Sequence, residues 1–142
     1  MTLKSQRPLV RVLCLPDIDR PIGGVKQLYK HVEHLLSLGW DAAVVTEQEG
    51  FRPTWFSSKA PTLSIQESQA KGEFFADKTI LLLPETYIGI NFKDFRGLDL
   101  SQLTRVIFNQ NAYYTYGSIE PNLDKKAQDL RDFYDSNLVL QI

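Results

Sequence analysis

The sequence predicts an α/β fold in which a mostly parallel sheet carries helices on both faces. Short, almost wholly apolar segments alternate along the chain with helix-length connections, which is typical of parallel strands covered on both sides. The first such segment, residues 10–15, leads into a turn-rich loop that ends in two glycines, and an amphipathic segment follows at once. A strand, a glycine loop and a helix in this order form the first βα unit of such a fold.

Length and composition limit the number of domains and the kinds of partner that we expect. A chain of 142 residues suffices for one domain with a full core, so we expect residues 1–142 to form a single domain. Hydrophobic residues make up 43%, charged residues 23%, and the net charge is −1, which argues against disorder and against a nucleic-acid partner. The polar N-terminus lacks a signal-peptide run, and no stretch approaches the roughly 20 apolar residues of a membrane span. We therefore expect a cytoplasmic protein.

The first helix is predicted from its apolar spacing. From Val25 to Leu36 apolar residues recur at helical intervals, and Gly39 is placed to end the helix as a left-handed C-terminal cap. His31 and His34 lie off the apolar stripe, and no third metal ligand accompanies them, so we expect both at the surface. No metal site is predicted.

The polar face of this helix also carries Lys26 and Lys30. These charges and the two histidines could contact an anionic membrane surface, but a solvated helix face is the more common role for so few charges. Peripheral membrane contact is therefore kept as an alternative.

The remaining elements follow from apolar runs, helical spacing and breaks at turn-forming residues. Strands are expected at 42–46, 61–66, 79–83, 105–108 and 138–142. Helices are expected at 66–76, 98–103 and 123–134, and an aromatic-rich loop at 50–60. Six strands in alternation with helices predict a Rossmann-like, doubly wound sheet of order 3-2-1-4-5-6. Ligands of such sheets bind at the carboxyl ends of the strands, where strands 1 and 4 lie side by side.

Position at these carboxyl ends selects the candidate site residues. They are Asp17, Gly23 and Gly24 after strand 1, Thr46 and Glu47 after strand 2, Glu85 and Thr86 after strand 4, and Asn109, Gln110 and Asn111 after strand 5. The set contains no recognisable nucleophile motif. Cys14 lies within the first apolar run and is expected to be a buried, free thiol.

For two groups of these residues a purely structural role is an alternative to ligand binding. Gly23 and Gly24 fit neither the G-x-G-x-x-G pattern nor a P-loop, so they could bring a phosphate to the helix N-terminus or merely allow a tight turn. The amides at 109–111 and the nearby Tyr113 suit a polyhydroxylated ligand, because amides hydrogen-bond to hydroxyls and tyrosine rings cover sugar faces. Tyrosines at 113, 114 and 116 could equally pack against the sheet.

Four segments form a characteristic set: a strand ending in a glycine pair, a helix GGV…L…V..L…G, a short strand AAVVT, and a later strand RVIFNQN. Together they resemble the N-terminal half of GT-B glycosyltransferases of the family 4 (group 1) type. The resemblance implies sugar transfer with retention, from a nucleotide-sugar substrate to a sugar or lipid-linked acceptor, with no cofactor or metal.

The resemblance also implies roles for single residues. Gly23 and Gly24 would approach the donor diphosphate, and the acceptor side would be lined by Asp17, Glu85, Asn109, Gln110, Asn111 and Tyr113. Many members carry a histidine near the end of the strand that corresponds to 105–108, and amides stand there in this chain, so no histidine role is transferred. No catalytic residue is assigned.

The donor-binding half of the family is not found in this sequence. No glutamate has a second glutamate eight positions on, so the E-x7-E motif of the C-terminal domain is absent. We therefore expect an acceptor-side domain that is inactive alone. The alternatives are a non-catalytic Rossmann-like module that binds a nucleotide or a protein, and an unrelated small α/β enzyme.

Overall fold

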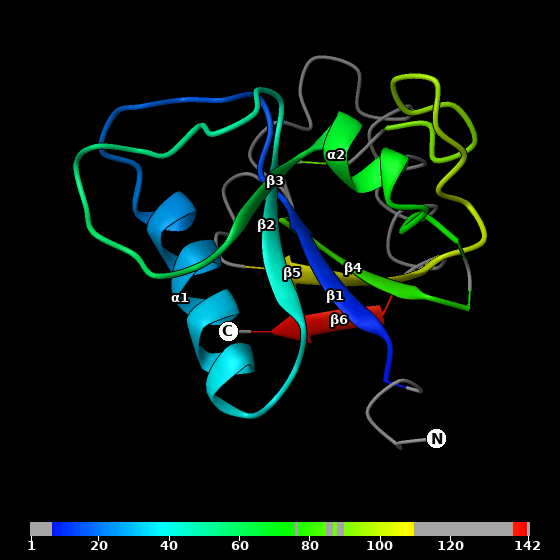
Figure 1. Ribbon diagram of the computed structural model, residues 1–142, viewed down its shortest axis with the longest axis horizontal. Helices are drawn as coiled ribbons and strands as arrows, with labels where there is room; N and C mark the ends of the chain where they lie inside the picture. Colours follow the sequence, from blue (N-terminus) through cyan, green and yellow to red (C-terminus); the bar gives the residue numbers. More distant parts are fainter. Residues whose placement is uncertain (1–6, 76, 85–86, 88–89, 110–137, 142) are drawn as a thin grey trace, which may run out of the picture.

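The computed structural model describes residues 7–75, 77–84, 87, 90–109 and 138–141 (Figure 1). The elements in chain order are β1 (Leu9–Leu13), α1 (Gly23–Ser37), β2 (Ala42–Thr46), β3 (Thr62–Ser64), α2 (Ile65–Ala70), β4 (Thr79–Pro84), β5 (Thr104–Asn109) and β6 (Leu138–Gln141).

All neighbouring strands in the sheet are parallel. Their order is β3-β2-β1-β4-β5, and β6 pairs with the outer side of β5. In register, Val12 of β1 lies between Val44 of β2 and Leu82 of β4. The predicted α/β class and the parallel order 3-2-1-4-5 are thus confirmed, with β1 at the centre.

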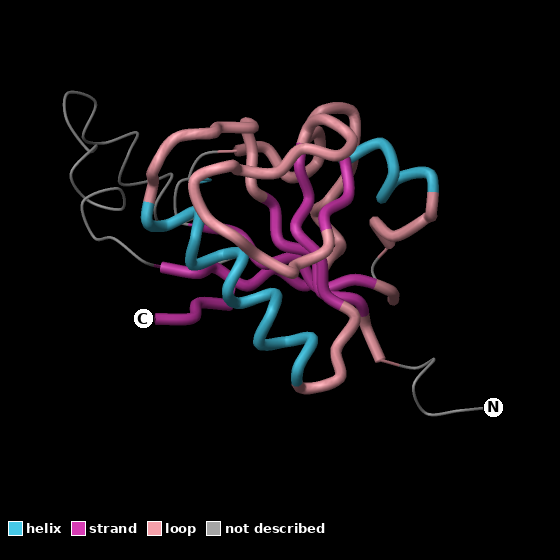
Figure 2. The backbone as a smooth tube through the Cα atoms, turned by 60° about the vertical axis from the view of Figure 1, so that its left-hand side comes forward, coloured by secondary structure: helices cyan, strands magenta, loops and turns pink. Residues whose placement is uncertain are grey.

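One face of the sheet is covered by α1 (Figure 2). Leu28, Tyr29 and Val32 of this helix are buried in one cluster with Val12 of β1. Helical spacing places these side chains on one side of α1, as the sequence predicts. The helix ends at Ser37, and Gly39 follows with φ of +89°, so its predicted role as a left-handed cap is confirmed.

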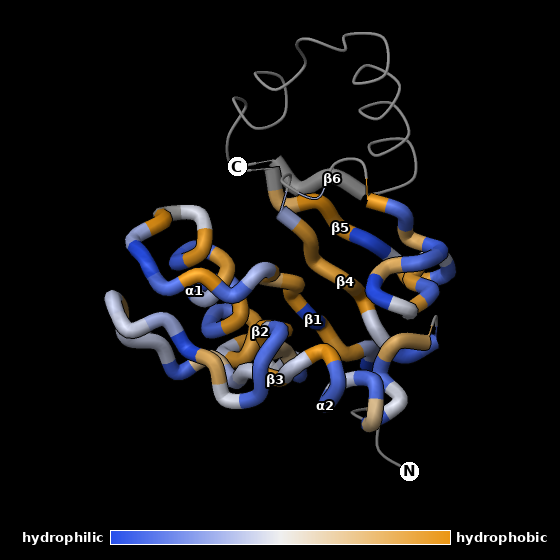
Figure 3. The backbone as a smooth tube through the Cα atoms, turned by 90° about the horizontal axis from the view of Figure 1, so that it is seen from above, coloured by the Kyte–Doolittle hydropathy of each residue, from blue (hydrophilic) through white to orange (hydrophobic). Residues whose placement is uncertain are grey.

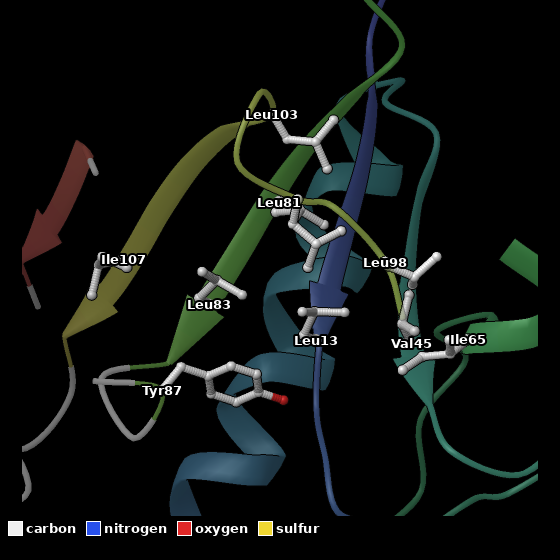
Figure 4. Close-up of a cluster of buried hydrophobic side chains, with 10 residues drawn as sticks. Leu13, Val45, Ile65, Leu81, Leu83, Tyr87, Leu98, Leu103 and Ile107 are labelled. Carbon is white, nitrogen blue, oxygen red and sulfur yellow. The ribbon is translucent and has the colours of Figure 1, made fainter. Parts of the chain in front are cut away.

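The opposite face is covered by α2 and by described parts of the β4–β5 connection (Figure 4). Leu81 and Leu83 alternate with Leu82 along β4, so they lie on the face away from α1. Figure 4 shows them beside Leu13, with Leu103 near the start of β5. Seen from above, β1, β2 and β4 carry mostly hydrophobic residues and the outer loops are mostly hydrophilic (Figure 3).

The predicted helix at 98–103 is wrong. This segment forms turns, because the carboxylate of Asp99 accepts hydrogen bonds from both the N–H and the hydroxyl of Ser101 at 2.9 and 2.6 Å. Arg105 Nη1 donates to the carbonyls of Leu100 and Ser101 at 3.0 and 2.8 Å. These contacts replace the hydrogen bonds that a helix would form within itself.

The predicted helix at 66–76 is shorter than expected. The segment α2 begins with a capping box, in which Ser64 and Glu67 each accept a hydrogen bond from the other's backbone N–H. It ends at Ala70, and Gly72 follows with φ of +67°, in the left-handed region that turns the chain away. The predicted helix 123–134 lies outside the described residues.

A buried charge cluster joins α2 to the central strand. Arg11 of β1 is only 3% exposed, and its Nε and Nη2 donate to the two carboxylate oxygens of Glu73 at 2.7 and 3.0 Å. Ser68 donates to the same carboxylate at 2.7 Å, and Arg11 Nη1 reaches Asp41 Oδ1 at 3.2 Å. The bidentate pair satisfies most of the hydrogen-bonding capacity of both charged groups. The sheet can therefore carry an arginine at its centre.

The Arg11–Glu73 pair predicts an acid-sensitive stability. Burial raises the pKa of Glu73, but the hydrogen bonds from Arg11 and Ser68 and the charge of Arg11 outweigh burial, so the pKa is lowered. Because the folded-state pKa is lowered, the ionised Glu73 stabilises the folded state at pH values above its unfolded-state pKa of about 4.3. This contribution is lost as the pH falls through the folded-state pKa. We expect Glu73→Gln to cost about 3–5 kcal/mol in urea unfolding at pH 7 and to remove this acid dependence.

The matched control is Asp41→Asn, which removes the other carboxylate that contacts Arg11. The Asp41 side chain is 68% exposed, so we expect a cost below about 1 kcal/mol. Equal costs for the two variants would show that Glu73 does not neutralise Arg11 in the way described.

Candidate functional site

Two aspartates hold the loop that leaves β1 at the carboxyl edge of the sheet. Asp17 accepts hydrogen bonds from the N–H groups of Glu47 and Gln48, each at 2.9 Å, just after β2. Asp19 accepts from the N–H and the hydroxyl of Thr54 at 2.7 and 2.8 Å. The loop 14–22 is therefore fixed to β2 and to the β2–β3 connection. This is the role that the structure gives Asp17, and its contact with an acceptor stays a prediction.

The glycine pair differs from the expectation in its position. Gly23 and Gly24 are not part of the loop but form the first turn of α1, and Ile22 is the N-cap residue in extended conformation. The carbonyl of Ile22 accepts the N–H groups of Val25 and Lys26 at 3.1 and 3.4 Å. The N-cap residue Ile22 makes no side-chain cap hydrogen bond and no acidic residue lies in the first turn, so the positive end of the helix dipole has no carboxylate from that turn beside it.

A tyrosine connects the exit of β4 to the exit of β1. The hydroxyl of Tyr87 accepts the backbone N–H of Leu15 at 2.9 Å, and the residue is 6% exposed. Figure 4 shows the ring beneath the ends of β4 and β1. Burial raises the pKa of Tyr87, so its hydroxyl stays protonated at neutral pH.

An ion pair spans the same edge. Arg96, in the β4–β5 connection, pairs through Nη1 with Glu47 after β2. Its guanidinium also lies over the Phe95 ring, 5.6 Å from the ring centroid. Arg96 has a φ of +53°, which is unusual for a residue other than glycine. The connection after β4 thus reaches across to β2 and helps to enclose the carboxyl edge.

The thiol of Cys14 lies beside this edge but is not activated. Burial, reinforced by the negative charge of Asp17, raises the pKa of Cys14 to about 11. A thiol with this pKa is protonated at neutral pH and is a poor nucleophile. The residue is a free thiol as predicted, but it is half-buried and not fully buried as the sequence suggested.

The prediction that both histidines lie at the surface is wrong for His31. Its ring packs against Phe108 of β5 with the centroids 4.2 Å apart, and burial lowers the pKa of His31. His34 is exposed as predicted. Among the described residues, no three histidine, cysteine, aspartate or glutamate side chains gather closely enough to hold a metal ion. In the same part of the chain, no helix has the length and apolar character needed to cross a membrane.

The other predicted site residues lie near the end of β5 or beyond the described part of the chain. Asn109 is the last residue of β5 and is in register with Gln141 of β6, so its backbone lies at the carboxyl edge. Glu85, Gln110, Asn111 and Tyr113 lie outside the described residues. The structure therefore brings together the β1 loop, the start of α1 and the residues after β2.

Sequence reasoning missed two residues at this edge, Tyr87 and Arg96. An aromatic side chain shortly after a buried strand is a signal that could have identified Tyr87. No local pattern reveals the contact between Arg96 and Glu47, because it joins two loops that are far apart in the sequence.

No protein-family model, curated protein or solved structure matches this chain.

Backbone donors at a helix N-terminus, fixed carboxylates and a guanidinium are groups that bind charged, hydroxylated molecules.

The hydrogen bond of Tyr87 predicts a stability effect. Tyr87→Phe removes the acceptor for the Leu15 N–H and should lower the free energy of unfolding by about 1–3 kcal/mol. The control is Tyr29→Phe, because the Tyr29 hydroxyl has no hydrogen-bond partner among the described residues. Thermal and urea unfolding of both variants measure the difference, and a cost at Tyr29 equal to that at Tyr87 would contradict this account.

Proposed function

We propose that this chain is the acceptor-side, N-terminal domain of a retaining GT-B glycosyltransferase of the family 4 type. In this proposal the sheet is Rossmann-like and doubly wound, with β6 as its sixth strand. The order β3-β2-β1-β4-β5 supports it, because β1 connects to β2 on one side while β4 connects to β5 on the other. Ligands of such sheets bind where the strand connections begin to run in opposite directions, between β1 and β4.

The observation that carries the proposal is the start of α1. Two glycines form its first turn directly after the β1 loop, the apolar Ile22 is the N-cap residue, and no acidic residue lies in that turn. Such a helix end attracts an anion, and the lack of a Cβ allows close approach to the backbone N–H groups. We assign the diphosphate of a nucleotide-sugar to Gly23 and Gly24. They would stabilise the negative charge that develops on the departing diphosphate.

The acceptor would lie along the carboxyl edge beside this helix end. We assign acceptor contacts to Asp17, Glu85, Asn109, Gln110, Asn111 and Tyr113. The fixed position of Asp17, which two backbone N–H groups hold, suits a residue that orients an acceptor hydroxyl. The nucleotide-sugar is the substrate, and no cofactor or metal is part of the proposal.

We further propose a cytoplasmic location, with a sugar or lipid-linked acceptor. Lys26 and Lys30 on the polar face of α1 would provide weak contact with anionic lipid if the acceptor is membrane-bound. Nucleotide-sugar binding would be completed by a C-terminal domain.

The need for a second domain gives a test of the enzyme class. The purified chain alone should transfer no sugar from any nucleotide-sugar. An in-frame second domain with two glutamates spaced E-x7-E should restore transfer when it is joined to this chain. Turnover by the 142-residue chain alone would contradict the proposal, and so would an inactive two-domain protein that only binds nucleotide.

The phosphate role of the glycine pair is tested with two variants of equal size. Gly24→Asp places a negative charge in the first turn of α1. This charge interacts favourably with the positive end of the helix dipole but repels a bound anion. Gly24→Asn is the neutral control. We expect inorganic pyrophosphate to shift the N–H resonances of Gly23 and Gly24 in NMR titrations, and to bind Gly24→Asp at least about fivefold more weakly than Gly24→Asn. Equal affinities would refute the assignment.

A further inference from the structure

A tight hairpin in the β4–β5 connection carries an arginine at its tip. Phe95 and Leu98 form an antiparallel bridge, in which each backbone N–H donates to the other residue's carbonyl, at 2.8 and 2.9 Å. The two residues between them, Arg96 and Gly97, have φ of +53° and +83°. Positive φ at both central residues is the mark of a type I′ turn, where asparagine or glycine is preferred. Arginine is disfavoured in this conformation, which points to a role for its side chain.

The hairpin places this arginine at the carboxyl edge of the sheet. Leu98 packs in one hydrophobic cluster with Val45 of β2, and Figure 4 shows the two side chains next to each other. The guanidinium of Arg96 pairs with Glu47, two residues further along the chain than Val45. Ligands of parallel α/β sheets bind at this edge.

Contacts with Tyr87 place the guanidinium close to the ends of β4 and β1. It lies over the Phe95 ring, whose centroid is 6.2 Å from that of the Tyr87 ring. The hydroxyl of Tyr87 in turn accepts the N–H of Leu15, just after β1. Burial raises the pKa of Tyr87, and the positive charge of Arg96 acts against that shift. Arg96 therefore lies beside the position at which the strand connections begin to run in opposite directions.

A ligand can reach this guanidinium. The side chains of Arg96 and Glu47 are 46% and 31% exposed, and the ion pair between them is made through Nη1. Exposed ion pairs hold their partners only weakly. A guanidinium has five N–H donors and is bound best by an acceptor that takes two of them at once. The Glu47 carboxylate can therefore be exchanged for a stronger anion.

Charge selects the kind of anion. A ligand carboxylate would replace Glu47 with a group of equal charge, whereas a phosphate monoester carries a charge of about −1.5 to −2 at pH 7 and three acceptor oxygens. Two other carboxylates nearby are bound to backbone N–H groups: Asp17 to those of Glu47 and Gln48, and Asp94 to that of Gly97 at 3.3 Å. Among the described residues, Glu47 is the carboxylate that forms an ion pair with Arg96.

We propose that Arg96 binds a phosphate monoester group of the acceptor, and that Glu47 takes the place of this phosphate in the ligand-free chain. The phosphate forms a bidentate pair with the guanidinium, and the Glu47 side chain turns to solvent. The assignment of the phosphate to an acceptor rests on the proposed function. The anion site itself rests on the hairpin and on the exposed ion pair.

The test is an NMR titration of the 142-residue chain with D-glucose 6-phosphate, which follows the Arg96 Nε–H signal and the backbone N–H signals. The comparison ligands are D-glucose, which lacks the phosphate, and D-glucuronate, which carries a carboxylate on a similar ring. We expect glucose 6-phosphate to shift the Arg96 signal and to bind at least about fivefold more tightly than either comparison ligand. Equal binding of glucose would overturn the anion site, and equal binding of glucuronate would overturn the phosphate assignment.

Arg96→Asn locates the binding without loss of the turn. Asparagine is preferred at this position of a type I′ turn, so the urea midpoint of the variant should not fall. Its affinity for glucose 6-phosphate should fall at least about tenfold, because the bidentate pair is lost. The control is Lys93→Gln, which removes an exposed cation from the same connection and should leave the affinity unchanged. Unchanged affinity in Arg96→Asn would overturn the proposal.

Glu47→Gln distinguishes an exchangeable ion pair from a merely structural one. Glutamine does not compete for the guanidinium, so the affinity for glucose 6-phosphate should rise about two- to fivefold, the factor by which an exposed ion pair holds its partners. If the pair served only to hold the connection against β2, the affinity would fall or stay the same. Either of these results would overturn the exchange.

The phosphate can belong to a soluble sugar or to a lipid, and a second measurement distinguishes the two sources. Vesicles of phosphatidylcholine with added phosphatidic acid present a phosphate monoester at a lipid surface. Binding to these vesicles that is lost in Arg96→Asn indicates a lipid-linked acceptor, and binding to glucose 6-phosphate alone indicates a soluble one. Binding to neither would overturn the proposal.

Failure of this proposal is distinguishable from failure of the transferase proposal. Pyrophosphate reports on Gly23 and Gly24, and its effect on their N–H signals should be the same in Arg96→Asn. If glucose 6-phosphate binding is lost in Gly24→Asp but kept in Arg96→Asn, the anion lies at the start of α1, and this proposal fails while the transferase proposal stands. If binding depends on Arg96 but the joined two-domain protein is inactive, the anion site stands and its assignment to an acceptor fails.

Discussion

The charge of Arg11 is the constraint around which one layer of the molecule is built. A central strand of a parallel sheet is covered on both faces, so a guanidinium there has no access to water. Glu73 can reach it because α2 is short and the chain turns at Gly72. The short α2 and the turn at Gly72 thus place Glu73 where it can pair with the buried charge.

The carboxyl edge of the same strand is organised by carboxylates that bind backbone. Asp17 and Asp19 each hold a neighbouring connection through two hydrogen bonds, and Tyr87 ties down the start of the same loop. The loop that precedes α1 is thus set before any ligand arrives. A fixed loop fixes the start of the helix, and preorganised donors cost no reorganisation when a charged group binds.

Local pattern was sufficient for much of the fold. The strand at 42–46 has the predicted bounds, and the spacing from Val25 to Leu36 and the position of Gly39 define α1 and its end. The predicted strand order holds for β1 to β5 because each apolar run and its connection obey the rules of parallel sheets.

Long-range contacts account for what the sequence did not reveal. The segment 98–103 has helical spacing, but Asp99 and Arg105 take its backbone groups into turns. His31 lies off the apolar stripe of its own helix, yet Phe108 from β5 packs against it. Tyr29 lies within the helical spacing from Val25 to Leu36, but only the three-dimensional structure shows that its hydroxyl has no described partner. The sequence therefore predicted the strands and their order, which define the carboxyl edge, but not these contacts.

The shortness of β3 has a consequence for how copies of this molecule behave toward one another. An edge strand exposes unpaired backbone groups, and long, flat edges recruit strands from other molecules into aggregates. Here the edge strand is only three residues long, Pro61 precedes it without an N–H to donate, and α2 begins at the next residue. This side of the sheet offers a second chain too few peptide groups to extend, which protects a parallel sheet during the slow stages of its assembly.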